Sequence, residues 1–305
     1  MKQPDSNAAL LGFIPSDDKS SYTVTAPEAN ISGKLIIPSE YNNLPITKIA
    51  TSAFNGCREL TEVTLPNTLT EIGAHAFMGC EMLTQINLPS GVKSIGKYAF
   101  CHCRSLPRIT IPSATEMIGE GAFRDCISLF AIEIDINNTS YIFKDNCLIE
   151  TASKTLIWGC PSSKIATDGS VERIGNSAFG DRKDLHSITI PNGIKEIGIE
   201  AFSACHSLDN VTVPGSVKKI GEEAFSCCLR LSSLTLENGI KAIDDAAFLC
   251  CSSLSSLTLP ESIEHIGEYA FARCEALGEV IMPASFPDID ETVFSECENV
   301  KIVLK

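Results

Sequence analysis

The sequence has few of the features that indicate catalysis, membrane insertion or nucleic-acid binding. It contains only five histidines and has no Gly-x-Ser-x-Gly, P-loop or His-Glu-x-x-His motif. It also lacks an apolar run of about 18 residues, so we expect no membrane insertion. Basic residues are scarce, because 24 lysines and arginines stand against 38 acidic residues and the formal net charge is −14. This balance argues against nucleic acid as a partner. We expect a protein that is not an enzyme and needs no cofactor or metal.

What the sequence does contain is an internal repeat of 23 residues. Phenylalanine recurs at this spacing in two runs, at positions 54, 77, 100 and 123 and at 179, 202, 225, 248, 271 and 294. Isoleucine stands five residues before each of these phenylalanines, and alanine directly precedes nine of the ten. Cysteine follows three residues later in nine copies, and Arg182 is the exception. The unit is I-G-x-x-A-F-x-x-C-x-x-L-x-x-V-x-L-P.

Each unit predicts two short elements. The L-x-x-V-x-L-P part alternates apolar and polar residues and ends at proline, which is typical of a half-buried strand. The I-G-x-x-A-F-x-x-C part is too short for a stable isolated helix, so we predict a helical turn that packs inward through Ile, Ala, Phe and Cys. One unit cannot bury this apolar face, whereas stacked units can. The sequence therefore predicts an α/β repeat solenoid, with one short parallel strand and one short helical turn per repeat.

The unit resembles the BspA-like leucine-rich repeat, also called the Treponema pallidum type. The landmarks of that family, A-F-x-x-C and L-P, stand here as Ala76-Phe77-Met78-Gly79-Cys80 and Leu88-Pro89. The stretch from Ile37 to Ile46 is similar to the family's usual start of its first complete repeat. The resemblance covers about residues 31 to 304. It implies a right-handed leucine-rich-repeat coil in a secreted or cell-surface bacterial protein that binds host proteins, matrix or other cells. It carries over no catalytic residue.

The chain divides into five expected segments. They are a flexible leader at 1–20, an N-terminal cap and first strand at 21–48, repeats at 49–134, a hairpin interruption at 135–170, and repeats with a C-terminal cap at 171–305. Residues 1–7 are polar where a signal peptide has its apolar core, and the apolar stretch 8–14 is short. Either the protein is not exported or its export signal lies upstream of Met1, and the family resemblance favours the second.

Fourteen cysteines would ordinarily indicate disulfides in an exported protein. Nine of them share one repeat position, however, where we expect buried, reduced thiols that behave as small apolar groups and donate to a backbone carbonyl. Cys227 and Cys250 share another position on adjacent repeats, while Cys147 and Cys160 lie within the interruption at 135–170. Either pair is a candidate disulfide.

Two patterns raise the question of a metal site. In Cys101-His102-Cys103 the second cysteine should face the core and the histidine should face out, so the ligands diverge. An acidic column occupies one repeat position at Glu222, Asp245, Glu268 and Glu291. It is either a stripe for calcium or a basic ligand, or a set of acids at the start of a helical turn, where the helix dipole favours them. We favour the dipole, because it needs only one residue per coil.

The interruption lies between the two runs of repeats. Residues 141–150 and 155–158 alternate like paired strands around a polar turn at 151–154, which predicts a β-hairpin. Tyr141, Phe143 and the single tryptophan, Trp158, lie in this segment. They are either anchors of a protruding contact element or a cover for the core where a repeat is missing. The second interpretation is favoured.

The outward positions of the predicted strands form a candidate binding face. Most carry Ser, Thr or Asn, which suit a pleated surface, and the face is more varied near the interruption. The candidate binding residues are Arg108, Phe130, Glu133, Tyr141 and Trp158. We predict a protein-binding or adhesion module that uses the sheet face and the hairpin. The alternative is a structural or self-assembling surface component without a specific ligand, which the uniform Ser/Thr face favours.

Overall fold

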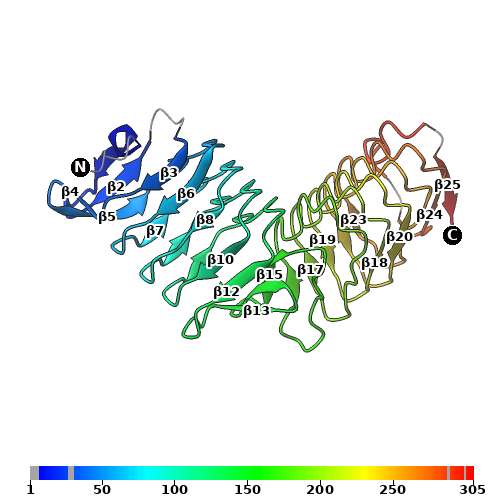
Figure 1. Ribbon diagram of the computed structural model, residues 1–305. Helices are drawn as coiled ribbons and strands as arrows, with labels where there is room; N and C mark the ends of the chain where they lie inside the picture. The colour runs from blue at the N-terminus through cyan, green and yellow to red at the C-terminus, as the bar shows by residue number, and fades with distance from the viewer. Residues whose placement is uncertain (1–6, 27–30, 287–288, 299) are drawn as a thin grey trace. The chain divides into compact units, whose positions relative to one another are not determined.

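The computed structural model describes residues 7–26, 31–286, 289–298 and 300–305. The chain forms two compact units, residues 1–143 and 144–305, which we call the first and the second unit. In each unit the chain winds in successive coils, and the short strands of neighbouring coils lie side by side (Figure 1). A regular coil carries a leucine-side strand, from the L-x-x-V-x-L-P part, and an isoleucine-side strand that ends at the isoleucine before the A-F pair. Each unit is therefore a β-solenoid.

The first unit begins with a short 3-10 helix, η1 (Ala8–Leu10). Its isoleucine-side sheet contains β1 (Gly12–Pro15), β2 (Tyr22–Thr25), β4 (Glu40–Tyr41), β5 (Leu44–Ile49), β7 (Glu71–Ile72), β9 (Ser94–Ile95) and β11 (Met117–Ile118). Its leucine side consists of one sheet with β3 (Gly33–Ile36), β6 (Leu60–Thr64) and β8 (Gln85–Ile86), and another with β10 (Arg108–Ile111) and β12 (Ala131–Ile134). Strand β13 (Tyr141–Lys144) follows in sequence.

In the second unit the isoleucine-side sheet contains β14 (Cys147–Glu150), β15 (Thr155–Gly159), β16 (Arg173–Ile174), β17 (Glu196–Ile197), β19 (Lys219–Ile220), β21 (Ala242–Ile243) and β23 (His265–Ile266). Its leucine side has β18 (Asn210–Val213) with β20 (Ser233–Leu236), and β22 (Ser256–Thr258) with β24 (Glu279–Met282) and β25 (Lys301–Leu304). Most strands of neighbouring coils pair in parallel one repeat apart, as Val211 with Leu234 and Ile220 with Ile243. The parallel leucine-side strand was predicted from the sequence, whereas the isoleucine-side strand was not.

The predicted helical turn is wrong. Among the described residues η1 is the only helix, and the A-F segment of each coil is a series of turns. Around nine of the ten phenylalanines, two residues of this segment adopt the left-handed backbone conformation, one on each side at a distance of two residues. Around Phe77 they are His75, with φ of 56°, and Gly79, with φ of 72°. A right-handed helix cannot contain such residues.

Hydrogen bonds between coils take the place of those in a helix. The N–H of Phe54 donates to the carbonyl of Ala76 at 2.8 Å, and the N–H of Gly56 donates to that of Met78 at 2.7 Å, both one coil later. An α-helix would satisfy these amides within the segment. In this fold, alternate amides of the segment link one coil to the next, so the turns form a further ladder along each unit.

The glycine after the isoleucine allows the coils to approach closely. A Cβ atom on Gly96 would lie 2.4 Å from the backbone nitrogen of Ala74, in the preceding coil. Gly119 would meet the backbone of Lys97 at the same distance. No side chain fits at that distance, which explains why the repeat has glycine there.

The core of each unit is built from two repeated columns. Neighbouring phenylalanine rings are stacked within each unit, with centroids 4.9 to 5.9 Å apart. Beside them, eight of the nine column cysteines donate through the thiol to the carbonyl of the phenylalanine in the preceding coil, as Cys228 does to Phe202 at 3.3 Å. The predicted bond from thiol to carbonyl is confirmed. Burial raises the pKa of the Cys205 and Cys274 thiols to about 12, so they remain neutral. All fourteen cysteines, the two candidate pairs included, are free.

The predicted leader and the predicted hairpin, which lie before and after the first run of repeats, agree only in part with the structure. Strands β14 and β15 form an antiparallel hairpin around residues 151–154, as the alternating pattern predicts. In the predicted leader, residues 12–15 instead form strand β1, which pairs with β2, so this part is not a loose segment. Residues 1–6 of the leader lie outside the described residues.

Candidate functional site

Two of the candidate residues lie on the leucine side of the first unit. Arg108 begins β10 and Glu133 lies in β12, and both side chains point outward because residues alternate along a strand. The two strands pair in parallel with Thr110 opposite Glu133, and the Thr110 hydroxyl donates to the Glu133 carboxylate at 3.3 Å. Within the described part of the chain Arg108 has no ion-pair partner. Its guanidinium is therefore available to a carboxylate from outside.

A break in the sheet creates a depression beside Arg108. One coil earlier the N–H of Thr84 donates to the Thr61 carbonyl at 2.9 Å, and one coil later the N–H of Phe130 donates to the Pro107 carbonyl at 3.2 Å. Proline has no N–H, so Pro107 cannot make the equivalent bond to Thr84, and β8 and β10 belong to separate sheets. A cavity of about 310 Å³ lies there and is lined by Thr84, Gln85, Ile86, Asn87, Pro107 and Arg108.

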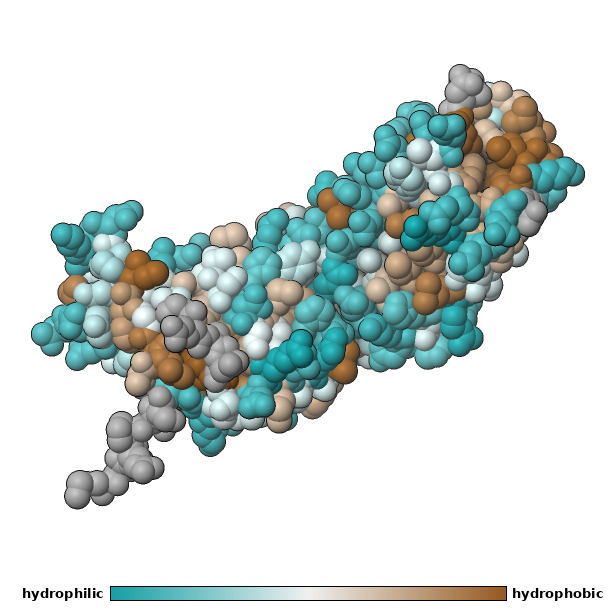
Figure 2. All heavy atoms as spheres, turned by 90° about the horizontal axis from the view of Figure 1, so that it is seen from above, coloured by the Kyte–Doolittle hydropathy of each residue, from teal (hydrophilic) through white to brown (hydrophobic). Residues whose placement is uncertain are grey.

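Phe130 and Ile136 flank β12 and are unusually exposed for apolar residues. Their exposed fractions are 66% and 96%. Hydrophilic residues cover much of the face drawn in Figure 2, where hydrophobic ones form separate patches. In the earlier repeats the position of Phe130 holds Thr61, Thr84 and Pro107, and that of Ile136 holds only polar residues. Phe130 is predictable from the sequence as a binding residue, and Ile136 becomes so only when the same position is compared across repeats.

Tyr141 lies beneath the surface of the first unit. Its side chain is 1% exposed, and its hydroxyl accepts the N–H of Ile118 at 2.8 Å and donates to the carbonyl of Glu116 at 3.4 Å. In this conformation Tyr141 is not accessible to a partner. Its hydroxyl holds strand β11 by hydrogen bonds to the backbone.

Trp158, in the second unit, is also buried, at 3% exposed. The guanidinium of Arg182 lies 4.9 Å from the centroid of its ring, which is within range of a cation–π contact. Arg182 stands in the cysteine column, is 2% exposed, and donates through Nε to the carbonyl of Gly159 at 3.0 Å. The only tryptophan and the only departure from the cysteine column are thus in contact. Both were visible in the sequence, but their contact was not.

A charged cluster of the first unit contains His102, Arg104 and Asp125. His102 Nδ1 and Arg104 Nε lie 2.8 Å and 2.7 Å from the same Asp125 oxygen. The hydrogen bond with Asp125 raises the pKa of His102 to about 10. Burial favours the neutral form of Asp125, but the hydrogen bonds from His102 and Arg104 hold its pKa below the usual value. The thiol of Cys103 donates elsewhere, to Phe77, so Cys103 and His102 point apart as predicted, whereas the side chain of Cys101 lies beside His102.

One member of the acidic column, Asp245, bonds to the backbone of the next coil. The N–H of Glu268 donates to the Asp245 carboxylate at 2.9 Å, and at the same repeat position Asn176 accepts the N–H of Ile199 at 2.9 Å. The helix-dipole explanation is wrong, because the segment is not helical. Among the described residues, no three or more His, Cys, Asp and Glu side chains are grouped as ligands for a metal ion. No helix in the described ranges is long and apolar enough to cross a membrane.

Solved structures of similar proteins share this architecture. A leucine rich cell surface protein of Faecalibacterium prausnitzii is 24% identical, with a TM-score of 0.57, over 99% of this chain and 94% of its own. The pneumococcal vaccine antigen PcpA is 18% identical, with a TM-score of 0.65, over 96% of this chain and 88% of its own. A leucine-rich repeat protein of Eubacterium ventriosum is 21% identical, with a TM-score of 0.61, over 95% and 91%. At these identities the likeness shows the fold alone.

The repeat itself provides the stronger match. The model of the BspA type leucine rich repeat region matches six copies, over residues 47–168 and 172–301. A search of curated proteins finds no match. The match spans both units and includes the phenylalanine and cysteine columns that build their cores. The chain therefore belongs to the BspA-type leucine-rich-repeat family.

Proposed function

We propose that this chain is a non-enzymatic protein-binding module of a bacterial surface protein, and that Arg108, Phe130 and Glu133 contact the partner. The observation that carries the proposal is the exposed ring of Phe130 next to Pro107 and Arg108, on a strand face that is otherwise mostly polar. Aromatic residues and arginine supply much of the binding energy of protein interfaces. Ile136, at the other end of β12, is a second exposed apolar residue.

Two further considerations support this proposal. Solenoids present extended faces on which partners bind, and the leucine side of the first unit has the depression described above. Two of the similar structures are described as a cell surface protein and a vaccine antigen, which supports a location at the bacterial surface. Tyr141 and Trp158 are left out of the proposed contact surface because they are buried.

Binding to immobilised matrix and cell-surface proteins tests the proposal. We expect saturable binding to at least one protein, weakened about tenfold or more by Phe130→Ser and by Arg108→Ala, since each side chain would be a central contact. The matched controls are Leu229→Ala, an exposed apolar residue of the second unit, and Arg58→Ala, an exposed arginine elsewhere on the first unit. A saturable partner whose affinity is unchanged in both test variants would refute the assignment of this surface.

A structural role without a specific ligand is the second candidate. Its support is the uniform leucine side of the second unit, where the exposed strand positions are Asn210, Thr212, Ser233, Thr235, Ser256 and Thr258. Sedimentation velocity at rising concentration separates the two roles. Concentration-dependent assembly with no saturable partner would favour the structural role.

A further inference from the structure

The coil that follows the hairpin is shorter than the repeat. Strands β15 and β16 place Leu156 opposite Ile174, and β16 and β17 place Ile174 opposite Ile197. The first of these steps takes 18 residues and the second takes 23. The isoleucine side of this coil is complete, because both pairings are in parallel register. The missing five residues are therefore taken from its leucine side.

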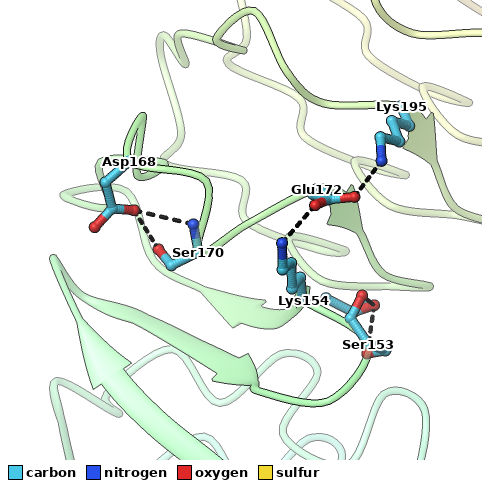
Figure 3. A network of polar contacts seen from close by, with 7 residues as sticks. Ser153, Lys154, Asp168, Ser170, Glu172 and Lys195 are labelled. Atoms are coloured by element: carbon cyan, nitrogen blue, oxygen red, sulfur yellow. Dashed lines mark hydrogen bonds and ion pairs between the residues drawn. The ribbon is translucent and has the colours of Figure 1, made fainter.

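Polar contacts fix this short path. Asp168 accepts the N–H of Ser170 at 3.0 Å and its hydroxyl at 2.6 Å, which forms a tight turn. Glu172 then accepts from Lys154 at 2.6 Å and also from Lys195, so that its carboxylate lies between the two lysines (Figure 3). The short coil is thus bonded to the hairpin and to the following coil.

The next coil is left with an unpaired strand edge. In complete coils the amide at the first outward strand position donates to the preceding coil, as Lys301 does to Gly278 at 2.9 Å and Ser233 to Asp209 at 3.4 Å. The equivalent residue here is Ser187. Because the direction of the backbone N–H alternates along a strand, the N–H of Thr189 points the same way as that of Ser187. Among the described residues, the amides of Ser187 and Thr189 have no hydrogen bond.

The core is also incompletely covered at this edge. Ile188 occupies the position of Val211 and Leu234, which are buried, yet it is only partly buried. Ser187 forms a single bridge with Asn210 of the following coil, so the covering strand is absent on the preceding side alone. Unpaired backbone groups and a partly exposed core residue mark the same edge.

A groove of about 600 Å³ lies along this edge. It is lined by residues 161–165 and Thr167 of the short coil on one wall, and by residues 187–189 and Pro191 on the other. This volume is typical of ligand sites. Lys164, on the first wall, is exposed and has no ion-pair partner among the described residues.

We infer that this groove binds an extended segment of a partner protein by strand addition. The segment pairs its backbone with Ser187 and Thr189, which is how peptides join a free sheet edge. Since side chains alternate along a strand, every second residue of the bound segment should be apolar, so that it covers Ile188. An acidic residue should face Lys164.

The groove belongs to the second unit and contains none of the residues assigned to binding in the first. The inference therefore goes beyond the proposed function and does not depend on it. Variants at Arg108 and Phe130 test only the surface of the first unit. Either site can fail without the other.

A labelled peptide with the sequence of residues 60–66, Leu-Thr-Glu-Val-Thr-Leu-Pro, tests the inference by fluorescence anisotropy. This is the strand of a complete coil, and it has alternating apolar residues and an acid. We expect saturable binding to the full chain with a dissociation constant below about 1 mM. Methylating the backbone nitrogens of its central Glu and Val should weaken binding about tenfold, since each lost hydrogen bond contributes modestly.

Matched variants locate the peptide. Ser187→Trp should fill the groove and weaken binding about tenfold or more, while Ser233→Trp, at the same repeat position in a complete coil, should leave it unchanged. Lys164→Glu should weaken it, and Lys183→Glu, an exposed lysine outside the groove, should not. Amide exchange measured by NMR provides a readout on the wild-type chain, because the peptide should slow exchange at Ser187 and Thr189. Absence of saturable binding, equal binding to both tryptophan variants, or full binding of the methylated peptide would overturn the inference.

Discussion

In two coils of the second unit, different residues fill the same position of the core. In the regular coil the small thiol of Cys228 donates to the carbonyl of Phe202. In the coil that departs from the repeat, Arg182 donates to the carbonyl of Gly159 and its guanidinium covers Trp158. The repeat therefore requires a donor toward the preceding coil and a matching volume, and not cysteine itself. Where the repeat is kept the surface is uniform, and where it departs the surface acquires a groove.

The largest effect is expected in the regular coils. Phe225 is fully buried and stacks on both neighbouring rings, so Phe225→Ala should lower the free energy of unfolding by about 3–5 kcal/mol. Phe294 ends the column, is only partly buried and has one stacked neighbour among the described residues. Phe294→Ala should cost clearly less. Urea unfolding followed by circular dichroism measures both, and equal losses would contradict a column that is stabilised by neighbours on both sides.

The departing coil provides the next largest effect. Arg182→Cys restores the residue of the repeat, yet it should lower the free energy of unfolding by about 2–3 kcal/mol, because a thiol cannot fill the space beside Trp158. Trp158→Leu should remove the same contact. In a double-mutant cycle the combined loss should be smaller than the sum by about 1 kcal/mol. Additive losses would show that the two residues are independent departures.

The cysteine column should contribute less per residue to the free energy of unfolding. Cys228→Ala removes one buried hydrogen bond and little volume, so we expect a loss of about 1 kcal/mol. Cys160, in the short coil, is partly exposed and outside the column. Its replacement by alanine should change the free energy of unfolding by less than about 0.5 kcal/mol. Equal effects in urea titrations would remove the distinction between column and non-column cysteines.

The comparison also explains what could be predicted from the sequence. The positions of Phe77 and Cys80 recur, so their burial followed from periodicity alone. The left-handed residues on each side of Phe77, His75 and Gly79, follow no single residue type from coil to coil, so the sequence did not reveal the turns that replace the predicted helix. Contacts between coils, such as that of Arg182 with Trp158, depend on register across the interruption.

The candidate surfaces were predictable to different degrees. Phe130 departs from a mostly polar position and was predicted, whereas the groove depends on five residues that are missing, and a missing strand leaves no motif. The signal for the groove was the irregular spacing between Phe123 and Phe179, which was interpreted as a hairpin alone. Spacing between repeats is therefore as informative as the residues that repeat.

The smallest effect concerns a departure in the first unit, where His102 and Asp125 occupy the position of Gly56 and Gly79. The pKa of His102 is raised from 6.5 to about 10, first by its hydrogen bond with Asp125. A raised pKa means that the protonated form stabilises the fold fully below about pH 6.5, and that this contribution is lost as the pH rises toward 10. The stability difference between wild type and His102→Gln, from urea titrations, should be constant at low pH and shrink between those values. It should not exceed about 1 kcal/mol, because the imidazole is partly exposed to solvent. Asp125→Asn should lower the pKa of His102 in an NMR titration, and an unchanged pKa would show that the pair at this left-handed position is no more than a substitute for glycine.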